Sequence, residues 1–152
     1  MPKALIIFAS LTGNTQEMAD FLGKKLRALK VETEVVECMQ TEPEEFKDFD
    51  ICIIATYTYG TDGDLPDEML DFYEDLEDVD LSGKVYGVLG SGQYFYEHFC
   101  RAVDYFDEQF QKTNATRGAD SLKVELNISE AEKVKLETFA QDLITAYQHL
   151  KV

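Results

Sequence analysis

Three stretches of the chain, residues 4–9, 50–55 and 85–89, are almost purely apolar. Continuous apolar runs of this length predict strands covered on both faces, as in the middle of a parallel sheet. Two further strands are predicted at 31–38, where valines stand among charged residues, and at 122–126, where apolar and charged residues alternate. We expect the first of these at or near the sheet edge and the second to be half-exposed.

Apolar residues recur at helical spacing in four segments between and after these runs. Pro43 suits the first turn of a short helix at 42–45, and a capping box at 129–132 marks the start of the last long helix. Pro66 opens the second of the four helices. Their predicted inward faces are Met18, Leu22, Leu26 and Leu29; Met69, Phe72, Tyr73 and Leu76; Phe99, Val103, Phe106 and Phe110; and Leu136, Phe139, Leu143, Tyr147 and Leu150.

Strands and helices therefore alternate along the chain. This order predicts an α/β fold, a three-layer α/β/α sandwich in which right-handed crossovers place helices on both faces of a five-stranded parallel sheet. A chain of 152 residues is most simply a single domain spanning 1–152. Ligands of such sheets bind beyond the carboxyl ends of the strands, so the loops at 10–15, 56–65 and 90–96 are expected to form one site.

The first of these loops has the chemistry of an anion site. It opens a helix whose free N–H groups and positive dipole end face the turn. Its side chains add neutral donors, Gly13 allows close backbone approach, and the absence of Lys and Arg excludes a nucleoside-triphosphate loop. A bound terminal phosphate is the favoured interpretation, and a helix cap without a ligand is the alternative. The loop reads Ser10-Leu11-Thr12-Gly13-Asn14-Thr15.

The other two loops contain aromatic residues among glycines. Tyr57 and Tyr59 lie in the second loop, and Tyr94, Phe95 and Tyr96 lie in the third. Aromatic side chains at a ligand-binding edge suggest a flat ring stacked between them. The pair Tyr59 and Tyr96 suits this role, whereas Tyr57 and Tyr94, taken singly, are more typical of ordinary aromatic residues in a core or on a surface.

The charge of the chain limits the classes of partner that it is expected to bind. With 14 basic and 30 acidic residues the net charge is −16, which disfavours nucleic acid and anionic membranes and favours basic-surfaced proteins. From residue 48 to 83 there are twelve acidic residues and no Lys or Arg. No apolar stretch is long enough to span a bilayer, and the three cysteines Cys38, Cys52 and Cys100 suggest no disulfide framework or zinc site. These features, with no leader before the first strand, predict a cytoplasmic protein.

The three loops, taken in order, resemble those of the flavodoxin family. The first resembles the family's phosphate loop, Thr58-Tyr59-Gly60 its first flavin loop, and residues 90–100 its second. Because 122–126 carries no long insertion, the chain is similar to the short-chain group. The resemblance implies a flavodoxin-like sheet of order 2-1-3-4-5, non-covalently bound FMN and low-potential one-electron transfer.

The resemblance also implies a set of cofactor-binding residues. Tyr59 and Tyr96 would cover the two faces of the flavin ring, and Gly60 would respond to its redox state. Tyr59 stands where many relatives have Trp, and Gln93 stands where Asp is common. The phosphate would be held by Ser10, Thr12, Asn14, Thr15 and Thr58, with Gly13 beside it; the ring edge by the backbone of Gln93, His98 and Cys100; and Leu11, Ser91, Gly92 and Phe99 would complete the set.

Three functions are compatible with this topology. The favoured one is a monomeric electron carrier that serves basic-surfaced redox proteins, namely an NAD(P)H-dependent flavodoxin reductase and low-potential acceptor enzymes. The alternative is an FMN-dependent reductase of quinones, or one that activates a metalloenzyme. A phosphorylation-controlled receiver is disfavoured, because the first and third strands end in Ala9-Ser10 and Ala55-Thr56 rather than in aspartates.

Overall fold

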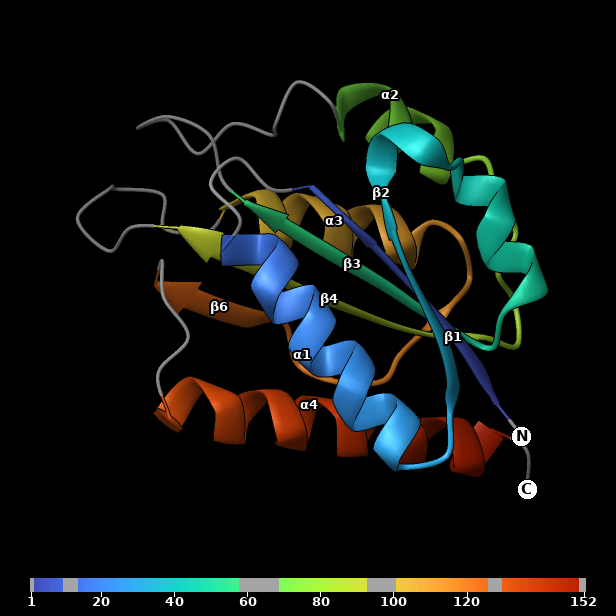
Figure 1. Cartoon of the computed structure of the whole chain (residues 1–152). Coiled ribbons are helices and arrows are strands. Elements are labelled where there is room, and N and C mark those ends of the chain that lie inside the picture. Colours follow the sequence, from blue (N-terminus) through green and yellow to red (C-terminus); the bar gives the residue numbers. More distant parts are fainter. Residues whose placement is uncertain (1, 10–13, 58–68, 93–100, 126–129, 151–152) are drawn as a thin grey trace.

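The three apolar runs form the centre of a parallel sheet in the computed structural model of the chain (Figure 1). The structure describes residues 2–9, 14–57, 69–92, 101–125 and 130–150. Strands β1 (Lys3–Phe8), β3 (Ile51–Tyr57) and β4 (Val85–Gly92) lie side by side, and β2 (Glu32–Glu37) forms the edge next to β1. The predicted edge position of the second strand is therefore confirmed.

Two short strands pair with β4 on the side that faces away from β3. Strand β5 (Thr116–Arg117) pairs the start of β4, and β6 (Leu122–Glu125) pairs its end. Residues 118–121 lie between them, opposite Gly87 and Val88 of β4. The predicted order 2-1-3-4-5 is confirmed, but six strand segments fill its five positions, and the sequence analysis missed β5.

Two helical layers cover the sheet (Figure 1). Helices α1 (Asn14–Ala28) and α4 (Glu130–Leu150) lie on one face. Helices α2 (Leu70–Leu76) and α3 (Arg101–Gln111) lie on the other with the 3-10 turns η1 (Cys38–Gln40) and η2 (Pro43–Asp48). Successive strand side chains point to opposite faces, so in β1 Ala4, Ile6 and Phe8 join the first core, whereas Leu5 and Ile7 join the second.

Most residues of the predicted inward helix faces are buried, Tyr73 and Tyr147 are partly buried, and Phe99 lies outside the described residues. The exceptions lie near helix ends. Leu29 is 43% exposed and Leu150 is 40% exposed. Helix α1 ends at Ala28, and Lys30 has a φ of 70°. The N–H groups of Lys30 and Val31 donate to the carbonyls of Arg27 and Leu26 at 3.0 and 2.9 Å. This is a Schellman cap, which turns the chain away before Leu29 can pack.

Cys38 and Cys52 are buried thiols that form no disulfide within the described residues. Burial raises the pKa of the Cys52 thiol well above its ordinary value, so this side chain is a neutral core residue, as predicted from its place in an apolar run.

Tyr86 is a buried polar residue at the opposite end of β4. Its ring stacks on Phe110 with centroids 4.6 Å apart, and its hydroxyl donates to Asp107 Oδ1 at 2.5 Å. Arg117 Nη2 lies 3.4 Å from Asp107 Oδ2. Burial, and then the hydrogen bond to Asp107, raise the pKa of Tyr86 above its ordinary 10.0.

We expect Tyr86→Phe to lower the free energy of unfolding by roughly 1.5 kcal/mol, because it removes a hydrogen bond to a charged acceptor. The pKa of Tyr86 is higher in the folded than in the unfolded protein, so this stabilisation is complete below pH 10 and declines as the pH rises further. Urea denaturation at pH 7 and at alkaline pH measures the difference. Tyr105→Phe is the control, and an equal loss of stability at both pH values would contradict the expectation.

Candidate cofactor site

The carboxyl ends of β1, β3 and β4 lie at one edge of the sheet, together with the N-termini of α1 and α3 (Figure 1). The ladder between β1 and β3 extends beyond Phe8, since the N–H of Ala9 donates to the carbonyl of Ala55 at 3.0 Å. In sequence, the segments 10–13, 58–68 and 93–100 follow these strand ends. The three loops predicted to form one site therefore start from the same edge.

A buried pair of hydroxyl groups joins two of these elements. Thr15, in the first turn of α1, is 1% exposed, and Ser91, near the end of β4, is 3% exposed. Their oxygens lie 2.9 Å apart, and either can be the donor. This hydrogen bond ties the start of α1 to the end of β4 across 76 residues of sequence.

The end of β3 carries a second buried hydroxyl. Thr56 is fully buried, and its Oγ1 donates to the carbonyl of Tyr57 at 3.0 Å. Tyr57 itself is partly buried and packs against the core beneath α2 and α3. This placement agrees with the interpretation of Tyr57 as an ordinary aromatic residue.

Strand β4 continues further than the sequence analysis predicted. Residues 90–92 were expected in a loop but belong to the strand. Ser91 pairs with Tyr57 of β3 and with Val124 of β6, and Gly92 pairs with Glu125. Pairing on both sides thus keeps this polar, glycine-rich stretch extended, despite the low strand propensity of glycine.

At Gly90, helix α3 lies close to the sheet. A Cβ atom at this position would lie 2.5 Å from the carbonyl oxygen of Thr56 and 2.5 Å from Cγ2 of Val103. Only glycine allows both contacts. Gly90 and Thr56 lie in the predicted loops but not in the predicted cofactor-binding set, although a glycine directly after an apolar run is a sign of close backbone approach.

The structure places only part of the predicted cofactor-binding set. It brings Thr15 and Ser91 together, starts α1 at Asn14 and ends β4 at Gly92. The remaining members lie outside the described residues: Ser10, Leu11, Thr12, Gly13, Thr58, Tyr59, Gly60, Gln93, Tyr96, His98, Phe99 and Cys100.

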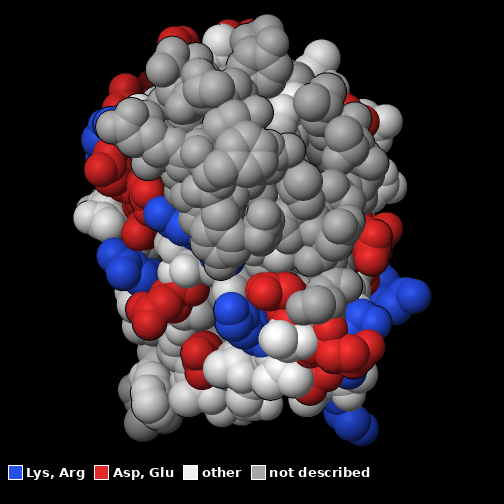
Figure 2. Space-filling model, turned by 90° about the vertical axis from the view of Figure 1, so that its left-hand side faces the viewer, with Lys and Arg blue, Asp and Glu red and all other residues white. Residues whose placement is uncertain are grey.

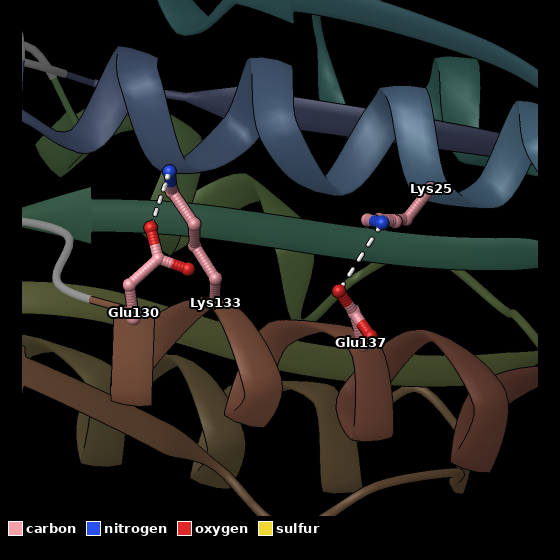
Figure 3. Close-up of polar contacts among 4 residues, drawn as sticks. All are labelled: Lys25, Glu130, Lys133 and Glu137. Atoms are coloured by element: carbon pink, nitrogen blue, oxygen red, sulfur yellow. Dashed lines mark hydrogen bonds and ion pairs between the residues drawn. The ribbon is translucent and has the colours of Figure 1, made fainter.

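Charge is distributed unevenly over the two helical layers. Around α2, the exposed charged residues between 69 and 83 are all acidic: Asp71, Glu74, Asp75, Glu77, Asp78 and Asp80. On the opposite layer the signs are mixed, and Lys25 of α1 lies 3.1 Å from Glu137 of α4 (Figure 3). Lys133 pairs with Glu130 within α4 at 3.4 Å. Seen from the side on which the strands end, acidic and basic side chains are interspersed below the region drawn in grey (Figure 2).

In the described ranges, no group of three or more His, Cys, Asp or Glu side chains is arranged to hold a metal ion. Among the helices of the same ranges, none combines the length and the apolar character needed to cross a bilayer.

The family model described as flavodoxin matches residues 6–139 of the chain. The chain belongs to the flavodoxin family. It is 40% identical over 142 residues to a probable flavodoxin 2 of Bacillus subtilis, with 93% of each chain covered. A flavodoxin structure from Streptococcus pneumonia TIGR4 is 52% identical, with a TM-score of 0.92 over 94% of this chain and 98% of the other. A short-chain flavodoxin associated with a non-canonical PDU bacterial microcompartment is 41% identical, with a TM-score of 0.94 over 97% and 99%.

Flavodoxins bind FMN and transfer electrons without a substrate of their own, and this chain is such a protein. The predictions of family, fold, cofactor and electron-transfer function are confirmed, and the alternative of an FMN-dependent reductase is not favoured. The described part of the edge fits the cofactor's phosphate. Neutral hydroxyl donors lie beside the N-terminus of a helix of 15 residues, which favours an anion.

Proposed function

We propose that this flavodoxin is a low-potential one-electron carrier, and that its FMN lies along the carboxyl ends of β1, β3 and β4. The observation that supports this placement best is the buried contact between Thr15 and Ser91. It joins the N-terminus of α1, which suits a phosphate, to the end of β4, which precedes the aromatic residues of the third loop in sequence. The N-terminus of α1 would receive the phosphate, and the flavin ring would lie toward β3 and β4.

The residues predicted from the sequence would hold the cofactor in this arrangement. The phosphate would accept hydrogen bonds from Ser10, Thr12, Asn14, Thr15 and Thr58, and Tyr59 and Tyr96 would stack on the ring. FMN supplies the redox chemistry, and the protein sets its potential. Gly60 would adjust its carbonyl to the protonation of the ring, since glycine tolerates the positive φ of a flipped peptide.

The acidic surface around α2 supports a low potential. Reduction places negative charge on the bound cofactor, which nearby carboxylates oppose. A carboxylate about 10 Å away costs on the order of 1–2 kcal/mol at an effective dielectric of roughly 20, before salt screening. Several such carboxylates would together make the fully reduced state harder to reach.

The same surface indicates the kind of partner. Exposed carboxylates on α2, such as Asp71, Glu74 and Asp75, attract basic surfaces and raise encounter rates. We propose an NAD(P)H-dependent flavodoxin reductase as donor and low-potential enzymes as acceptors. We further propose that the chain acts as a monomer in the cytoplasm and that residues 1–152 form one domain, since both cores are built on one sheet.

A reductive titration tests the proposal. We expect the protein with added FMN to be yellow and to be reduced by dithionite in two resolved one-electron steps. Long-wavelength absorbance should appear in the first step and vanish in the second, at a potential below that of free FMN. A single two-electron step would contradict one-electron transfer. Rapid turnover of NAD(P)H with a quinone, without an added reductase, would instead support the enzyme hypothesis.

A further inference from the structure

The hydroxyl of Ser91 is polar but lies within a buried strand. Its neighbours in the sheet are Tyr57 of β3 and Val124 of β6. Burying a hydroxyl without a hydrogen bond is unfavourable. Ser91 meets this requirement through Thr15, whose Oγ1 lies 2.9 Å from Ser91 Oγ. The two hydroxyls therefore share one hydrogen bond, in which either oxygen can be the donor.

When a phosphate is bound, the number of protons on the two hydroxyls decides which of them donates the hydrogen bond between them. Each hydroxyl has one proton to donate and can accept two hydrogen bonds. The oxygens of a doubly charged phosphate only accept. If Thr15 donates its proton to the phosphate, it must accept from Ser91, so the proton between the two side chains comes from Ser91.

We propose that Ser91 is a positioning residue for the cofactor phosphate, acting through Thr15. This inference rests on the proposed role of Thr15 as a phosphate donor. By donating to Thr15 Oγ1, Ser91 holds the Thr15 hydroxyl with its proton directed away from β4 and toward the helix start. A donor that is already oriented loses less rotational freedom on binding, and a hydroxyl that accepts one hydrogen bond donates more strongly in the next.

The contact also links the two ends of the site. Thr15 stands one residue after the start of α1, and Ser91 stands one residue before the end of β4. Because both side chains are buried, neither hydroxyl can exchange its partner for water unless α1 and β4 move apart. Ser91 therefore contributes to phosphate recognition from a strand whose continuation leads to the proposed ring contacts.

The test compares FMN with riboflavin, which has the same ring but no phosphate. Dissociation constants are measured by flavin fluorescence quenching for the wild type, Ser91→Ala, Thr15→Val and the double variant. Loss of one hydrogen bond of about 1 kcal/mol corresponds to roughly fivefold weaker binding. We expect Ser91→Ala to weaken FMN binding about fivefold and riboflavin binding less than twofold. In the Thr15→Val background, Ser91→Ala should have no further effect on FMN.

A matched control is Ser82→Ala, because Ser82 is exposed and bonds locally to Asp80 at 2.5 Å. It should leave both dissociation constants unchanged. Equal weakening of FMN and riboflavin by Ser91→Ala would overturn the inference, since it would indicate a purely structural role. An effect of Thr15→Val without one of Ser91→Ala would also overturn it, while the phosphate assignment stands. An unchanged FMN affinity in Thr15→Val would overturn the phosphate assignment itself.

Discussion

Gly90→Ala is expected to lower the free energy of unfolding by about 3 kcal/mol. The new methyl group would lie 2.5 Å from both the Thr56 carbonyl oxygen and Val103 Cγ2. Val103 could rotate, but the carbonyl belongs to the backbone of β3, which is paired with β4 at this residue. Relief of the carbonyl contact therefore requires β3 and β4 to move apart. Urea denaturation, followed by circular dichroism, measures the loss.

The matched control is the same substitution at Gly23. There the nearest atom to a new Cβ is Cγ2 of Val35 at 2.9 Å, the end of a side chain on the edge strand β2. Alanine also favours a helix over glycine by roughly 1 kcal/mol. We expect Gly23→Ala to be close to neutral. A loss below about 0.5 kcal/mol for Gly90→Ala would show that β3, β4 and α3 adjust more easily than close packing predicts.

Neutralising the acidic surface of α2 is expected to slow electron transfer about tenfold at low ionic strength. The variant Asp71→Asn/Glu74→Gln/Asp75→Asn removes three exposed carboxylates that are joined to no cation by a described ion pair. A basic partner would be attracted less strongly, so encounter would become less frequent. Stopped-flow reduction by an NADPH-dependent flavodoxin reductase measures the rate across a series of salt concentrations.

Salt and a second variant separate docking from other effects. At high salt the wild type and the triple variant should converge, because the Debye length falls to about 3 Å at 1 M. Glu130→Gln/Glu137→Gln/Asp142→Asn changes the net charge equally, but on α4 in the opposite layer. It should slow the reaction much less, and its broken surface ion pairs contribute little to stability. An equal slowing by both variants would mean that total charge, rather than the surface around α2, governs encounter.

Much of this fold could be read from local patterns. The apolar runs at 4–9, 50–55 and 85–89 predicted the three central strands, because a strand covered on both faces must be apolar throughout. Helical spacing predicted the inward faces of α1 and α3, where Leu22 and Phe106 are fully buried. The family could also be inferred from the sequence, since its loops are short contiguous motifs.

Local patterns were therefore enough to predict most of the elements, their alternation and the chemistry of the loops. They did not predict the extension of β4 through Gly92, the division of the last sheet position between β5 and β6, or the exposure of Leu29, which became visible in the folded chain. It also decided the partner of Ser91, which lies 76 residues away. A periodic pattern indicates which side of a helix or strand is buried. Strand pairing and hydrogen bonding, by contrast, depend on which distant segment of the chain lies beside that helix or strand.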